Sequence, residues 1–126
     1  MNKIVFGCLL LLTGLLSVSW LQQDEIVAAL RAGSAERMAK HFDAMVDVTV
    51  PGKSNTYSKS QAELVLRDFF SQNRVRGFEI QHSGNNPSST FLIGTLSTSN
   101  GNFRTTVYMR NRGSKLLVQG VELEAR

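Results

Sequence analysis

The sequence predicts a single α+β domain in which helices pack on one face of a curved antiparallel sheet. Its first half carries apolar residues at helical spacing in two short segments and one longer, capped segment. Four segments rich in strand-forming residues then follow one another, separated by turn signals. Consecutive strands joined by short turns pair as an antiparallel meander, so the helices are expected to cover one of its faces.

The first nineteen residues have the features of a secretory signal peptide. Lys3 supplies a positive charge, an apolar run follows, and residues 17–19 form a small-residue exit. The run is shorter than the roughly 20 apolar residues that a membrane span needs. We therefore expect export to the periplasm or the exterior, with a single mature domain at residues 20–126 and no stable membrane span after signal cleavage.

The mature domain contains no cysteine, because Cys8 lies inside the leader. A lipid-attachment cysteine follows the apolar core of its leader, so a lipoprotein is the less favoured reading of Cys8. Removing Lys3 from the 14 basic residues leaves 13 against 10 acidic ones. This excess is too small to favour a nucleic-acid partner, and the export signal argues against one as well.

Residues 22–42 predict two short helices separated by Gly33 and Ser34. Gly33 suits the left-handed position that ends a helix, and Ser34 suits the N-cap of the next one. The apolar stripes of the two helices are formed by Ile26, Ala29 and Leu30 and by Ala35, Met38, Ala39 and Phe42.

A short strand and a long helix come next. Valines at alternate positions from Val46 to Val50 predict the strand, and Pro51-Gly52 ends it in a way typical of a sheet edge. The helix is expected at residues 59–72, because overlapping capping boxes begin at Ser58 and Ser60. Its broad apolar face consists of Ala62, Val65, Leu66, Phe69 and Phe70.

Four strands are expected after this helix, at residues 75–82, 90–98, 103–111 and 115–124. Asn100-Gly101 is the strongest hairpin signal among the connections. Residues 85–88 and 112–114 supply the other two reversals.

This order of elements resembles the nuclear transport factor two-like fold, in which a curved sheet wraps around helices as a cone. A closer resemblance spans nearly all of the mature domain and rests on the run from Tyr57 to Glu63, Phe69-Phe70, Phe78, His82-Ser83-Gly84, Gly94-Thr95, Asn100-Gly101, Arg104 and Gln119. On these residues the sequence resembles a family of small exported proteins of unknown function from Bacteroidetes, with a cystatin-like, ketosteroid isomerase-like fold. The resemblance implies the fold and export, and it brings no active site or ligand.

Ketosteroid isomerase works with an aspartate base and an oxyanion hole made by a tyrosine and a protonated carboxylic acid. Residues of these types, together with histidines, occur here without a diagnostic motif: Asp43, Asp47, Asp68, Glu79, Tyr57, Tyr108, His41 and His82. Asp68 is expected on the helix flank opposite much of the apolar face. Capping and solvation explain Asp43 and Asp47, and His41 is expected to face water.

His82 is the candidate catalytic residue. Strand alternation places it on the same face as Phe78 and Ile80, toward the helices and the mouth of any cavity, where a histidine could act as a base or an acid. The competing interpretation, which we favour, is a structural residue that ends its strand before a turn at Gly84.

A basic row with one aromatic residue is expected on one face of the penultimate strand: Arg104, Thr106, Tyr108, Arg110 and Arg112. Such a row could receive an acidic peptide, a glycan or a phosphate. The favoured alternative is a charged solvent face in which Glu79, Glu122 and Glu124 pair with the arginines across the sheet. The same face could also form a homodimer.

Two classes of function remain open. The preferred one is a non-catalytic exported domain that binds a small apolar or peptidic ligand, or an envelope protein. Its candidate ligand-binding residues are Tyr57, Phe78, His82, Arg104 and Tyr108. The alternative is a small hydrolase or isomerase that uses His82 with a nearby carboxylate or Tyr57. No cofactor is predicted and no metal, since two separated histidines without cysteines make a poor zinc site.

Overall fold

The structure, a computed structural model, describes residues 21–86 and 88–126. The predicted leader at residues 1–19, with Cys8, lies outside the described residues. Among the helices of the described part, none combines the length and the apolar character that crossing a bilayer requires.

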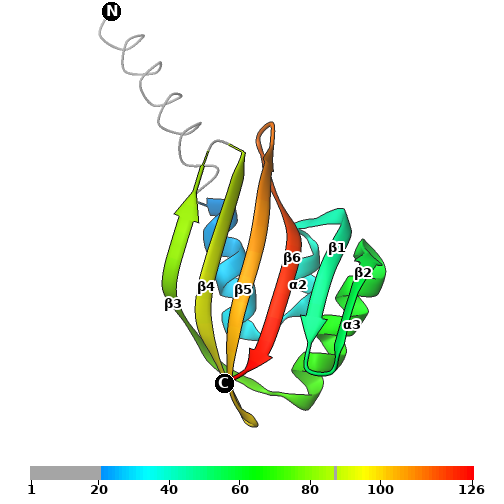
Figure 1. The fold of residues 1–126 in the computed structure, drawn as a ribbon, viewed down its shortest axis with the longest axis vertical. Helices are drawn as coiled ribbons and strands as arrows, with labels where there is room; N and C mark the ends of the chain where they lie inside the picture. Colours follow the sequence, from blue (N-terminus) through cyan, green and yellow to red (C-terminus); the bar gives the residue numbers. More distant parts are fainter. Residues whose placement is uncertain (1–20, 87) are drawn as a thin grey trace, which may run out of the picture.

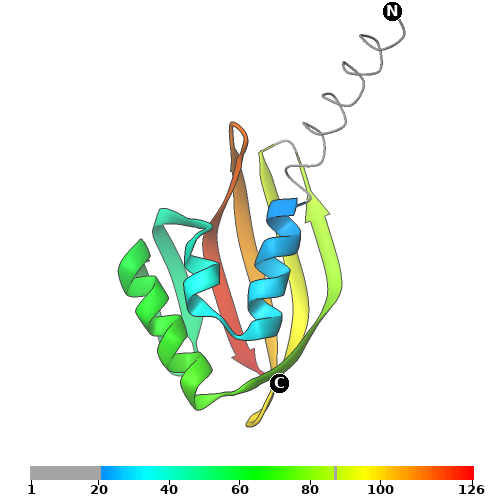
Figure 2. The same ribbon diagram turned by 180° about the vertical axis from the view of Figure 1, so that it is seen from behind.

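The described residues form two layers, a curved six-stranded sheet and helices on one of its faces (Figure 1). Figure 2 shows the helices in front of the sheet, whereas the opposite face of the sheet is uncovered in Figure 1. The predicted α+β class and its arrangement of layers are confirmed. The elements in chain order are an N-terminal helix at residues 21–32, α2 (Ala35–Ala39), β1 (Phe42–Val50), β2 (Lys53–Ser58), α3 (Lys59–Gln72), β3 (Val75–Asn85), β4 (Ser89–Thr98), β5 (Gly101–Arg112) and β6 (Lys115–Ala125).

The strands lie in the order β2-β1-β6-β5-β4-β3. Strands β3 to β6 form the predicted antiparallel meander. The prediction that β1 lies at the sheet edge is wrong, because β1 pairs in parallel with β6 and antiparallel with β2. At this end of the sheet the edge strand is β2. The sequence pattern does not reveal β2, because its six residues show no alternation of apolar and polar side chains.

The helix-to-helix junction forms as predicted. Gly33 has a φ of 61°, in the left-handed region that favours glycine. The Ser34 hydroxyl accepts the backbone N–H of Arg37 at 3.2 Å and caps α2. Phe42 differs from the prediction, because α2 ends at Ala39 and Phe42 begins β1 as a buried core residue.

Helix α3 has the predicted bounds. Ser58 is its N-cap, and the Ser58 hydroxyl accepts the backbone N–H of Gln61 at 3.4 Å. The buried face of α3 packs against α2 and the sheet, and it contains Ala62, Leu66, Phe69 and Phe70. The helix therefore covers the end of the sheet that holds β1 and β2, as Figure 2 shows.

A close approach between β3 and β4 fixes the position of Phe78. A Cβ atom added at Gly94 would lie 2.6 Å from the Phe78 ring and would also collide with the backbone oxygen of Glu79. Only glycine leaves room for the ring, which is buried in the core. Phe78 is thus a core residue. The sequence pattern also makes it a candidate ligand-binding residue, but its buried ring packs against Gly94.

Candidate functional site

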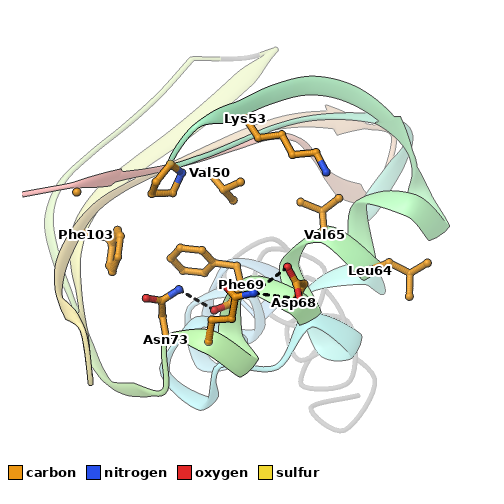
Figure 3. A pocket seen from close by; sticks show the side chains of 11 residues that line it. Val50, Lys53, Leu64, Val65, Asp68, Phe69, Asn73 and Phe103 are labelled. Carbon is orange, nitrogen blue, oxygen red and sulfur yellow. Dashed lines mark hydrogen bonds between the residues drawn. The ribbon is translucent and has the colours of Figure 1, made fainter.

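A cleft of about 650 Å³ lies between α3 and the nearby end of the sheet (Figure 3). It lies where the β1–β2 turn, the start of β5 and the end of β6 face the helix. Its walls are mainly apolar, and they are formed by Val50, Pro51, Leu64, Val65, Phe69, Phe103 and Ala125. Four polar side chains complete the lining: Lys53, Asp68, Gln72 and Asn73.

One stripe of α3 faces the cleft, because residues 64, 65, 68, 69 and 72 follow the helical spacing of three to four positions. Phe69 forms part of the cleft wall and is 6% exposed. Its ring meets the Phe103 ring edge to face, with centroids 5.0 Å apart. The contact joins α3 to β5, so the apolar wall of the cleft belongs to the core of the fold.

The polar groups of the cleft are partly engaged. The Gln72 amide donates to the Asp68 carboxylate at 3.4 Å, and the Asn73 amide donates to the Phe69 carbonyl at 2.9 Å and helps to end α3. Lys53 makes no ion pair within residues 21–86 and 88–126, and its ammonium lies 6.0 Å from the centroid of the Tyr57 ring. The cleft thus has mainly apolar walls, with the ammonium of Lys53 on one side and the carboxylate of Asp68 on the other (Figure 3).

The sequence did not place Asp68 at this site. Asp68 was expected on the flank of α3 away from the apolar face, but it lines the cleft between Leu64 and Gln72. Leu64 was the available signal in the sequence, because a leucine four positions before Asp68 extends the apolar face of the helix toward that carboxylate. In the structure Leu64 is 57% exposed.

His82 does not face the helices. The register between β3 and β4 shifts between Ile80 and His82, so that Ile80 pairs with Gly94 and His82 pairs with Ile93. This bulge turns His82 to the outer face of the sheet, where it is exposed and its ring lies 5.7 Å from that of Phe91. Strand alternation alone could not predict the change of face.

The proposed catalytic pairing of His82 with Tyr57 does not form. Tyr57 lies on the helix side of β2 and packs against the core, whereas His82 lies on the outer face of β3. These two strands are the opposite edges of the sheet. His82 instead shares a shallow outer hollow of about 560 Å³ with Arg104, Glu124 and Arg126.

The basic row on β5 lies on the outer face, as its alternation predicts. Tyr108 is 45% exposed, and its ring leans over Gly120, where an added Cβ would be 3.1 Å from the ring. The expected cross-sheet pairing of the row with Glu79, Glu122 and Glu124 is absent from the described residues, since no arginine nitrogen lies within 4.0 Å of these carboxylates. Arg112 contacts Asp43 instead, at 3.5 Å.

Asp43 belongs to a polar cluster beside irregular pairing in β1 and β6. The Gln119 amide donates a hydrogen bond to the Asp43 carboxylate at 3.1 Å, and the backbone N–H of Ala44 donates a second one at 2.7 Å. These two bonds hold the pKa of Asp43 below its ordinary value. The nearby Arg112 and Arg110 act in the same direction, against burial. The cluster ties β1 to β6 at the outer face.

His41 is largely buried, in contrast to the prediction that it faces water. Its side chain is 14% exposed, and its Nε2 atom lies 3.7 Å from a carboxylate oxygen of Glu25. Glu25 belongs to the N-terminal helix at residues 21–32, so this helix lies beside His41. Both histidines therefore lie outside the cleft.

The family of the chain is decided by its match to a sequence profile. The profile described as "Domain of unknown function (DUF4783)" matches residues 23–124. The chain belongs to the DUF4783 family. No curated protein matches it.

Solved DUF4783 structures share the fold. One from Bacteroides fragilis is 31% identical with a TM-score of 0.77, over 81% of this chain and 96% of that one. One from Bacteroides ovatus is 29% identical with a TM-score of 0.78, over 81% and 93%. A domain of unknown function with a cystatin-like fold from Nostoc punctiforme, 14% identical with a TM-score of 0.65 over 86% and 76%, agrees in fold alone. The resemblance inferred from the sequence is thus confirmed for family and fold.

Proposed function

We propose that this domain is a non-catalytic exported binding module that takes the apolar part of a small ligand or of an envelope protein into the cleft beside α3. The cleft itself carries the proposal. Its volume of about 650 Å³ falls within the range of roughly 300–1,000 Å³ that is typical of ligand pockets. An apolar wall with a few polar side chains is also the usual composition of such pockets.

The chemistry of the lining supports binding over catalysis. General acid–base catalysis usually requires titratable groups that converge on one reacting atom. The lining residues include one carboxylate, that of Asp68, and one amine, that of Lys53, while neither histidine lines the cleft. These groups suit the orientation of a bound molecule.

Export is proposed from the sequence of residues 1–19. Fractionation of the native cells, with N-terminal sequencing of the recovered protein, tests it. We expect a shortened chain that begins near Trp20, in the periplasm or the medium. An intact chain that starts at Met1 in the cytoplasm would contradict export.

Binding to the cleft is tested with anilinonaphthalene sulfonate, an apolar fluorescent anion whose sulfonate complements Lys53. The test variant is Leu64→Ser, which shortens an exposed side chain at the cleft. We expect about fivefold weaker binding, because roughly 1 kcal/mol of apolar contact is lost. Met45→Ser is the matched control, since Met45 is 55% exposed and lies outside the cleft. Equal affinity of Leu64→Ser and the unaltered protein would contradict the proposal.

A further inference from the structure

We propose that β2 is a docking edge for an extended acidic peptide of a partner protein, which adds to the sheet beside β2 and places one apolar side chain in the cleft. The inference rests on the proposed binding function for the use of the cleft. It adds the class of partner and the way in which the partner is held.

The backbone of β2 has an unpaired side. Within the described part of the chain, β1 is the only strand that pairs with β2. Val50 and Lys53 flank the two-residue turn, so they form a hydrogen-bonded pair, and pairs then alternate along the hairpin. Ser54 and Thr56 consequently occupy non-hydrogen-bonded pairs, and their N–H and C=O groups point away from β1. Two donors and two acceptors are thus presented with the spacing of a β-ladder.

The edge is open to an added strand. Natural sheets protect their edges with short strands, lysine side chains, proline, bulges or a covering element. Of these devices, β2 has a length of six residues and a lysine at its first position, Lys53. β2 contains no proline, its pairing with β1 is continuous from Lys53 to Ser58, and residues 53–56 are exposed. Peptide addition to such an edge is a common mode of recognition, in which backbone bonds give affinity and pockets for alternate side chains give specificity.

The cleft lies where side chains of an added strand can reach it. Lys53 lines the cleft from β2, and Leu64 and Val65 line it from α3, as Figure 3 shows. Side chains of the added strand alternate between the two faces of the sheet, so every second one points to the side of α3. One of these can bury its apolar surface against Leu64, which is otherwise exposed.

The charges select an acidic peptide and disfavour a second copy of β2. Residues 53–59 include Lys53 and Lys59 and no carboxylate, and neither lysine forms an ion pair among the residues described. Pairing of two copies of β2 would bring like charges together across the new ladder. Carboxylates at the ends of an incoming strand would meet these lysines, while an apolar side chain in the cleft would bring no second carboxylate toward Asp68.

The probe is a fluorescein-labelled short peptide of alternating valine and threonine with an aspartate at each end, and binding is followed by fluorescence anisotropy. Thr56→Pro removes the N–H that points to the free edge and leaves the bonds to β1 in place. Thr56→Val is its matched control, because it removes only the hydroxyl that donates to Asp47 at 2.5 Å. We expect Thr56→Pro to weaken binding about tenfold and Thr56→Val to bind like the unaltered protein. The same peptide with lysine at each end should bind several-fold more weakly.

Amide hydrogen exchange in the unaltered protein gives an independent result if Thr56→Pro fails to fold. The aspartate peptide should slow exchange at Ser54 and Thr56. Binding without that protection, or equal binding by a folded Thr56→Pro variant, overturns the proposal. Protection of the Ser54 and Thr56 amides in the absence of peptide, together with a dimer in sedimentation, would show that β2 pairs with a second copy of the chain, and this result also overturns the proposal. A third outcome separates the two proposals. If the peptide does not bind but anilinonaphthalene sulfonate binding is still weakened by Leu64→Ser, the proposal of strand addition to β2 is wrong and the proposed binding function of the cleft is supported.

Discussion

Replacing Phe69 with alanine tests the packing between α3 and the sheet. The Phe69 side chain is 6% exposed, and its ring makes edge-to-face contacts with Phe70 at 5.8 Å and Phe103 at 5.0 Å. Burial of a phenylalanine contributes about 1.5–3 kcal/mol, and each edge contact adds about 0.5–1.5 kcal/mol. Measured losses for buried phenylalanines are about 3–5 kcal/mol. We expect about 3 kcal/mol, because the cleft lets water fill part of the space that the ring leaves.

The assay is urea unfolding followed by far-ultraviolet circular dichroism. Leu64→Ala is the control on the same helix, and its exposed side chain predicts a loss of less than about 0.5 kcal/mol. A double-mutant cycle with Phe103→Ala should give a coupling of about 1 kcal/mol, since the rings are in contact. A loss below about 1 kcal/mol for Phe69→Ala would refute the packing described for this ring.

Three further perturbations probe other parts of the fold. In thermal unfolding, Gly94→Ala should lower the free energy of unfolding by about 2–3 kcal/mol or more, because the added methyl group overpacks the core. The control Gly77→Ala has open space around its Cβ and should lower it by less than about 1 kcal/mol. Equal losses in the two variants would contradict the close approach at Gly94. Ser58→Ala should cost about 1 kcal/mol in urea unfolding, because α3 loses its N-cap, and no loss would speak against that cap. Asp43→Asn should lower the melting temperature at neutral pH, because the depressed pKa of Asp43 stabilises the fold above the unfolded pKa of about 3.9. That stability is lost as the pH falls through the depressed folded pKa of Asp43, so the melting temperatures of the unaltered protein and of Asp43→Asn should converge in acid. A difference between the two melting temperatures that stays constant with pH would show that the hydrogen bond from Gln119 to the ionised Asp43 is not the source of the stability.

Local signals in the sequence predict much of this fold. The bounds of α3 follow from the cap at Ser58 and from the apolar face that includes Phe69. The junction at Gly33 and Ser34 and the meander of β3 to β6 follow from turn chemistry and alternation. In each case the interactions that decide the structure lie within a few residues or between consecutive strands.

Other features depend on contacts that no local pattern encodes. β1 lies inside the sheet because it pairs with β6, far away in the sequence. β2 forms because β1 offers an edge, although its own residues are polar. His82 changes face because of one bulge, and Asp68 reaches the cleft because the β1–β2 turn lies opposite α3. The candidate site could therefore not be found from residue types alone.

Binding in the cleft beside α3 is the central claim, and a nuclear magnetic resonance titration with anilinonaphthalene sulfonate tests it most directly. The amide signals of the isotopically labelled protein report where the probe lies. We expect the largest shifts at Val50, Phe69 and Phe103, which line the cleft on three different elements. Shifts concentrated at Phe91 and Tyr108 would place the binding surface on the outer face of the sheet and would contradict the account.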